Sequence, residues 1–248
     1  MPWHEGQCFV PSHRTCRLAD MVRTTWFVAA FSALLVLFGS PAAPADVNKI
    51  VARLEARYRS ATTLQATFLE RYSEGGRATR VESGTVSFRR PAKMRWEYES
   101  PEPKLFVSDG RTIWFYVPGD KTVMRSPVKK SADWRTPFAL LTHDAKVSEL
   151  CSRVEMETEG RGSVAGHAVL RCTPKGQEEE IKEILIGVDS ATGDIERVTI
   201  HGAAGVEIDF RFANWVRDLP LIDSKFRFIA PAGVAIVQGQ ASQGGADH

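Results

Sequence analysis

The stretch from Ser83 to Tyr116 constrains the fold more than any other part of the chain, because it reads as four short strands in a row. Large apolar residues recur there at every second position, a period typical of strands with one buried face. A Ser-Asp-Gly turn at 108–110 joins the last two strands, and its glycine accepts the positive φ that tight hairpin turns require. The sequence therefore predicts an antiparallel meander with an apolar concave face. Val86 and Phe88 share one face of the first strand, and Met94, Trp96 and Tyr98 share one face of the second. The large aromatic residues Trp96, Trp114 and Tyr116 give the meander its apolar concave face.

The rest of the chain after residue 45 continues the β pattern, with two helical interruptions. Asp46 is a good N-cap, and the apolar residues from Val47 to Tyr58 fall at helical spacing. A second short helix is expected at Thr136–Leu141, where a proline occupies the first turn. About eleven strands are expected in all, which makes the class α+β or barrel-like rather than βαβ. The expected strands outside the meander are 63–72, 122–126, 151–157, 168–173, 180–188, 195–201, 206–215 and 226–229.

The first 45 residues have the features of a leader. In residues 21–45 a short positive region precedes an apolar run at 26–38, and Ala43-Pro44-Ala45 offers small residues for signal-peptide cleavage. We therefore expect a signal peptide at 21–45 and a single domain at 46–248, a length that suits one all-β domain. The alternative is an uncleaved membrane anchor, because the apolar run is close to the lower length limit of a span. Residues 1–20 are interpreted as an upstream extension outside the fold.

Composition and motif searches exclude several classes of function. The charges are nearly balanced, with 32 Lys and Arg against 30 Asp and Glu, and they are scattered, which argues against a nucleic-acid partner. The chain has no phosphate-binding loop, no dinucleotide fingerprint and no histidines at metal-binding spacing. The sequence thus predicts a protein that is not an enzyme and that has no cofactor and no metal site.

Cys151 and Cys172 are the two cysteines that follow the leader, and an exported protein allows a bridge between them. They flank a predicted hairpin. A turn centred on Arg161-Gly162 places the cysteines opposite each other, whereas a register one residue different pairs Val154 with Leu170 and misaligns them. A β-bulge would reconcile the two registers.

The chain has more large aromatic residues than a half-covered sheet of this size needs. A strongly curved sheet with helices across its mouth would arrange them around a cavity, which is the usual form of a lipid or acyl-chain site. A filled core is the simpler alternative, and composition by itself favours the filled core. The residues in question are Trp96, Phe106, Trp114, Phe115, Phe138, Trp215, Phe226 and Phe228.

The order and spacing of the central block resemble the periplasmic outer-membrane lipoprotein carrier family, known as LolA-like proteins. The resemblance extends from Asp46 to Val234. It rests on Arg90-Pro91, Met94-Arg-Trp96, Pro101-Glu-Pro103, Val107-Ser-Asp-Gly110, Trp114-Phe-Tyr116 and Thr136-Pro-Phe138.

The resemblance implies a fold, a function and a set of partners. The family fold is an unclosed antiparallel β-barrel with a helical lid over a hydrophobic cavity. Members take the acyl chains of lipoproteins from an inner-membrane ABC transporter and pass them to an outer-membrane acceptor, which is itself a lipoprotein. No Cys lies near the expected cleavage site, so the chain is similar to the periplasmic carrier rather than to the acceptor, and we expect a monomer.

The resemblance also assigns roles to residues. Arg90, with Pro91, corresponds to the family's lid latch, and a guanidinium can satisfy several helix-end carbonyls at once. The family's aromatic pair falls on Met94 and Trp96, and the thioether of Met94 suits a cavity that accepts varied chains. The expected acyl-chain cavity is lined by Met94, Trp96, Phe106, Trp114, Tyr116, Phe138 and Leu141.

A second function from a different class competes with the carrier. An envelope lipid-binding sensor or regulatory domain of similar fold would bind lipid or a protein partner to signal. Co-purification of an acylated protein would distinguish the carrier from such a sensor.

Overall fold

The computed structural model describes residues 46–128, 146–158, 160–161, 167–176 and 179–239. The expected extension at 1–20, the expected signal peptide at 21–45 and the predicted helix at Thr136–Leu141 lie outside the described residues. Pro44–His248 forms one compact unit, which contains all of the described helices and strands. None of the described helices has the length and apolar character needed to cross a membrane.

The first element is helix α1 (Val47–Arg59), close to the range that the sequence predicted. The Asp46 carboxylate accepts a hydrogen bond from the backbone N–H of Asn48 at 2.9 Å, which is a standard N-cap. Ile50, Leu54 and Tyr58 fall on one face of the helix and are buried. The helix therefore forms because a capped start precedes an apolar stripe that has a surface to cover.

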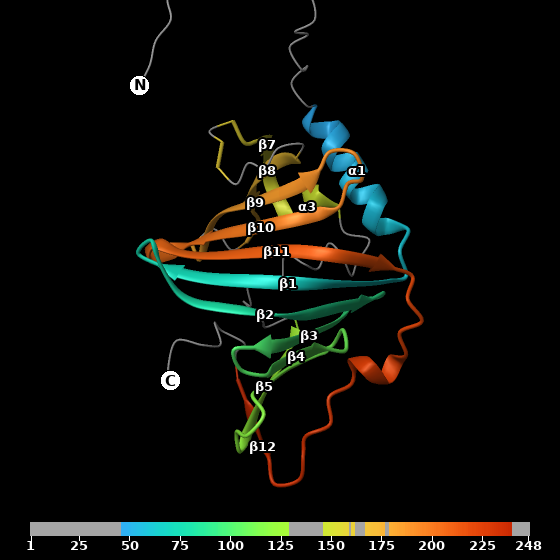
Figure 1. Ribbon diagram of the computed structural model, residues 1–248, viewed down its shortest axis with the longest axis vertical. Helices are drawn as coiled ribbons and strands as arrows, with labels where there is room; N and C mark the ends of the chain where they lie inside the picture. The colour runs from blue at the N-terminus through green and yellow to red at the C-terminus, as the bar shows by residue number, and fades with distance from the viewer. Residues whose placement is uncertain (1–45, 129–145, 159, 162–166, 177–178, 240–248) are drawn as a thin grey trace, which may run out of the picture. The chain divides into compact units, whose positions relative to one another are not determined.

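The rest of the described fold is one large sheet, shown in Figure 1. The strands lie in the order β12-β6-β5-β4-β3-β2-β1-β11-β10-β9-β8-β7. Neighbours are antiparallel, except that β12 is parallel to β6. The strands are β1 (Thr63–Glu74), β2 (Arg77–Arg89), β3 (Lys93–Ser100), β4 (Lys104–Ser108), β5 (Thr112–Tyr116), β6 (Thr122–Pro127), β7 (Cys151–Met156), β8 (His167–Pro174), β9 (Ile181–Asp189), β10 (Ile195–Gly202), β11 (Val206–Arg217) and β12 (Ala235–Gln238).

The predicted fold class is confirmed: the fold is mostly β, with an unclosed and largely antiparallel sheet and a short helix. Three details differ from the prediction. The described part of the chain holds twelve strands, and the expected strand at 226–229 is absent. Instead a 3-10 turn, η4 (Asp223–Phe226), leads to β12 further on. A one-turn helix, α3 (Val147–Leu150), precedes β7 and was not predicted.

The two faces of the sheet carry different side chains. We call the face that packs against α1 the inner face. Directly paired residues of adjacent strands share a face, so the register assigns each position. Phe68 on β1 pairs directly with Phe212 on β11 and with Gly84 on β2, and Trp96 on β3 pairs directly with Phe106 on β4. The main hydrophobic core lies on this inner face, together with the buried stripe of α1.

The C-terminal segment connects β11 to β12, as Figure 1 shows, and its residues pack against the outer face of β3 and β5. Phe226 in η4 is buried, and Phe228 packs on Trp114 with ring centroids 5.4 Å apart. Arg95 on β3 donates to the carbonyl oxygen of Lys225 at 3.1 Å. This segment therefore covers a second, smaller apolar surface on the outer side of the sheet.

A disulfide joins Cys151 on β7 to Cys172 on β8, with Cα atoms 5.5 Å apart. Neither register derived from the sequence is the one observed, because Cys172 pairs with Val154 and Cys151 pairs with Pro174. A β-bulge between Cys151 and Arg153 accounts for the offset. The bridge is therefore diagonal between the strands, and the expected bulge is present.

Gly84 allows β2 and β3 to approach closely. A Cβ atom at this position would lie 1.9 Å from the carbonyl oxygen of Glu97, at a point where the register of the two strands shifts. We predict that Gly84→Ala lowers the free energy of unfolding by about 1–3 kcal/mol, because backbone must move to admit the methyl group. Urea denaturation measures the change. The matched control is Gly202→Ala, whose Cβ would meet Val206 at an ordinary 3.4 Å. Equal stability losses in the two variants would contradict the prediction.

The disulfide generates a second prediction. The two cysteines are 21 residues apart, so the Cys151→Ala/Cys172→Ala variant should lose about 3 kcal/mol of stability through the larger entropy of its unfolded chain. Urea denaturation of the variant and of the oxidised protein checks this, and the parent in reducing buffer should match the variant. Peptide mapping that finds both thiols free in the oxidised protein would contradict the bridge.

Candidate functional site

Arg90, at the end of β2, binds the C-terminal end of α1. Its Nε donates to the carbonyl oxygen of Ala61 at 2.9 Å, and its Nη2 donates to that of Tyr58 at 2.6 Å. Its backbone N–H donates to the carbonyl oxygen of Thr62 at 3.1 Å. The last carbonyls of a helix have no partner within the helix, and the fork of one guanidinium satisfies two carbonyls at once at this helix end. Arg90 therefore joins the end of β2 to the C-terminal end of α1 and to the residues that follow it.

A second set of contacts ties α1 to the turn between β9 and β10. The Arg57 guanidinium binds the Asp194 carboxylate through two hydrogen bonds, at 2.5 and 2.9 Å. This hydrogen bonding to Asp194 raises the pKa of Arg57 above its ordinary value. One turn earlier, Arg53 donates to the carbonyl oxygen of Ser190. Gly193 has a φ of +81° and lies so close to the helix that a Cβ would be 2.9 Å from the Arg53 carbonyl oxygen.

Tyr58 links the helix to the sheet. Its hydroxyl oxygen accepts a hydrogen bond from the backbone N–H of Ile195 at 2.7 Å. Its ring meets that of Trp215 edge to face, with centroids 5.6 Å apart. Burial raises the pKa of the Tyr58 hydroxyl, so this group stays protonated at neutral pH. Neither Arg57 nor Tyr58 was among the predicted site residues, because the contacts connect positions 137 residues apart along the chain.

The inner face beside α1 is aromatic and closely packed. Trp96 is completely buried, and it makes edge-to-face contacts with Phe68 at 5.0 Å, Phe88 at 6.1 Å, Phe210 at 5.5 Å and Phe212 at 6.2 Å between ring centroids. Such pairs contribute stability beyond the area that they bury. Trp96 is therefore a central core residue in this arrangement, and a charged substitution there would destabilise the whole fold. The predicted site did not include these phenylalanines, although the alternating pattern of β1, β2 and β11 marks them.

The structure brings only some of the predicted cavity residues together. Met94, Trp96 and Phe106 are buried on the inner face. Trp114 pairs with Val107 and Tyr116 with Leu105, so both aromatic rings lie on the outer face, where they contact Phe228. The assignment of Trp114 and Tyr116 to the cavity is corrected accordingly, because consecutive positions of β4 and β5 alternate between faces. Phe138 and Leu141 lie outside the described residues.

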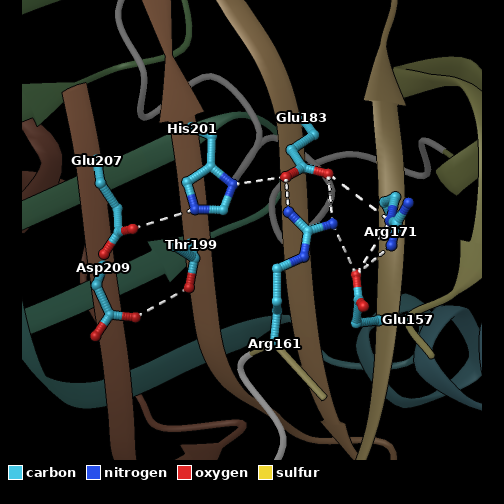
Figure 2. A network of polar contacts seen from close by, with 8 residues as sticks. All are labelled: Glu157, Arg161, Arg171, Glu183, Thr199, His201, Glu207 and Asp209. Carbon is cyan, nitrogen blue, oxygen red and sulfur yellow. Dashed lines mark hydrogen bonds and ion pairs between the residues drawn. The ribbon is translucent and has the colours of Figure 1, made fainter. Parts of the chain in front are cut away.

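The outer face of β8 to β11 carries a chain of ion pairs, shown in Figure 2. His201 lies between two carboxylates, with Nδ1 2.8 Å from Glu183 and Nε2 3.2 Å from Glu207. Arg161 bridges Glu183 and Glu157 at 2.5 and 3.0 Å. Burial by itself would raise the pKa of Glu183, but hydrogen bonds from Arg161 and His201 lower it overall. These contacts attach the described part of the β7–β8 connection to the outer face of the sheet.

Three possible metal ligands also meet on the outer face. His167 and Asp189 pair directly across β8 and β9, and Glu196 extends from β10 where the register shifts. Their ligand atoms all lie within 4.8 Å of one another, and His167 Nε2 is 2.6 Å from a Glu196 oxygen. The spacing of these residues along the chain gave no signal for this grouping. The Asp189 carboxylate accepts hydrogen bonds from the N–H groups of Thr192 and Ala191, which lower its pKa.

Comparisons with known proteins match most of this chain to one family of proteins. The family model described as "Outer membrane lipoprotein carrier protein LolA" matches residues 59–229. The outer-membrane lipoprotein carrier protein of Pasteurella multocida is 30% identical over 206 residues, which cover 83% of this chain and 93% of that protein. The corresponding protein of Dechloromonas aromatica is 29% identical over 72% of this chain and 83% of its own length. A crystal structure of an uncharacterised conserved protein from Thermus thermophilus superposes with a TM-score of 0.50 at 15% identity, covering 77% of this chain and 98% of that one, which shows a shared fold.

Proposed function

Because the chain belongs to the LolA family of outer-membrane lipoprotein carrier proteins, we propose that it binds the acyl chains of lipoproteins released from the inner membrane and delivers them to an outer-membrane acceptor. The family establishes a lipoprotein carrier, not an enzyme. The binding of acyl chains, the periplasmic location and the two docking partners are the proposal. The partners are an inner-membrane lipoprotein-releasing ABC transporter on one side and an outer-membrane lipoprotein acceptor on the other.

The inner face of the sheet is the surface that suits acyl chains. It carries the main apolar core, while ion pairs occupy the outer face of β8 to β11. Acyl chains gain free energy from apolar burial at about 0.8 kcal/mol per methylene group. The aromatic rings around Trp96 pack against one another in this arrangement. Chains therefore enter when the elements that cover the inner face move away from it.

The observation that carries the proposal is the pair of hydrogen bonds from Arg90 to the carbonyl oxygens of Tyr58, in the last turn of α1, and of Ala61, just after the helix. A carrier must take up its cargo and then release it. Release is favourable only if the empty, closed form is itself stabilised, because a ligand shifts an equilibrium by no more than its differential affinity for the two forms. Hydrogen bonds from a charged donor each contribute about 1.5–3 kcal/mol, which is enough to bias such an equilibrium.

The first test concerns the cargo. Native mass spectrometry of the protein isolated from the periplasm should find it with an acylated protein bound. Acyl chains, rather than the protein part, should hold that cargo, so a lipoprotein whose lipid-bearing cysteine is replaced by serine should not co-purify. Recovery of free lipid only would favour the sensor or regulatory function, and recovery of neither would contradict acyl-chain binding.

The second test concerns Arg90. Arg90→Leu removes the hydrogen bonds to α1, so the variant should accept lipoprotein but transfer it poorly, and loaded carrier should accumulate. Arg90→Lys keeps the charge without the fork and should be intermediate. The measurement is the rate of transfer from purified loaded carrier to the outer-membrane acceptor.

The neighbouring Arg89 supplies the matched control. It contacts the carbonyl oxygen of Leu221 and the carboxylate of Asp223 in the C-terminal segment rather than the helix. Arg89→Leu should therefore transfer cargo at the parental rate. Parental transfer by Arg90→Leu would show that the bonds from Arg90 to α1 do not regulate release.

A further inference from the structure

A charged cluster interrupts the apolar inner face. Glu70 on β1 and Glu82 on β2 are direct cross-strand partners on this face. They are only 2% and 4% exposed. Their positions break the apolar alternation of both strands, since Phe68 precedes Glu70 on the same face and Val86 follows Glu82 on the same face. Two like charges placed directly opposite each other destabilise a sheet, so this arrangement requires compensation from other residues.

Residues from three strands provide that compensation. The Tyr98 hydroxyl on β3 donates to a Glu70 oxygen at 2.7 Å. Lys104 on β4 binds Glu82, and Arg80 on β2 lies 3.1 Å from the other Glu82 oxygen. We call Glu70, Arg80, Glu82, Tyr98 and Lys104 the inner polar cluster. Separating these partners would leave buried charges unpaired, which is far more costly than breaking an exposed ion pair.

The cluster lies on the side of the inner face that is away from the point where α1 joins the sheet. The helix leads directly into β1 at Thr63, whereas Glu70 lies in the second half of that strand. The six steps along the strand from Leu64 to Glu70 span about 20 Å, which is comparable to an extended long-chain acyl group. The inner-face residues between Leu64 and Glu70 are apolar. Phe68 is the last of them before the cluster, and its ring centroid lies 5.0 Å from those of both Trp96 and Tyr98.

We propose that the inner polar cluster terminates the acyl-chain site and so determines the length of chain that the protein accepts. The inference rests on the function proposed above. A chain that enters beside α1 gains apolar contact along β1 to β3 until it reaches the hydroxyl of Tyr98. Beyond that point it would have to displace ion pairs without replacing their hydrogen bonds. The cluster thus acts as a specificity determinant for the hydrophobic part of the cargo.

The test uses synthetic lipopeptides that differ only in acyl-chain length. In the parent protein, affinity should rise about fourfold for each added methylene group until the chain reaches the cluster, and then stop rising. In Glu82→Met/Lys104→Met the ion pair becomes apolar, so affinity should continue to rise with longer chains. The matched control, Lys93→Met/Asp223→Met, removes an ion pair at 2.9 Å on the other side of the sheet and should keep the parental length limit.

A measurement on the unaltered protein covers the case in which the double variant does not fold. A lipopeptide with a photoreactive group at the methyl end of its acyl chain should cross-link near Phe68, Trp96 and Tyr98. Cross-links at 73–79, beyond the cluster, would overturn the proposal. An unchanged length limit in the folded double variant would overturn it as well. Failure of the parent to bind any lipopeptide would overturn the proposed function together with this inference, whereas binding without a length limit overturns this inference alone.

Discussion

The attachment of the last turn of α1 at Tyr58 is the interaction on which the arrangement of helix and sheet depends. The Tyr58 ring packs on Trp215 of β11, its hydroxyl binds the backbone at Ile195, and its carbonyl accepts a hydrogen bond from Arg90. One residue therefore connects the helix to both halves of the sheet, which are separated by more than a hundred positions in the chain. A helix of this length is marginal in isolation, so its position depends on such tertiary contacts.

The two faces of the sheet carry different kinds of interaction. The inner face holds the apolar core, and the helix covers it. The outer face provides rigidity through the ion pairs of β8 to β11 and through the C-terminal segment, which covers Trp114 on β5. If the inner face opens for cargo as proposed, the framework on the outer face does not depend on it. The sheet is open, since its edge strands in the described part of the chain, β7 and β12, are not paired to each other.

The inner polar cluster and the Arg90 contacts lie on different sides of the inner face. Both use charged groups that are bonded within the protein. The Arg90 contacts involve carbonyls at the end of the helix, which water can satisfy when they are released. The carboxylates of the cluster are buried among strands, where water cannot substitute easily. The proposed acyl-chain site would therefore open more readily at the Arg90 contacts than at the cluster.

The sequence alone determined the strand pattern, because a period of two follows directly from the alternation of side chains across a strand, and it determined α1, because Asp46 and an apolar stripe specify a helix. The family resemblance, the latch candidate Arg90 and the pair of cysteines could also be identified from the sequence, because each depends on residue types and their order along the chain. Only the tertiary structure decided the face on which Trp114 and Tyr116 lie, because a face is defined by the register of paired strands and a shift of one residue reverses it. It also brought Arg57 to Asp194 and Glu70 to Glu82, since contacts across a long chain depend on the path of the backbone and leave no periodic signal in the residues themselves.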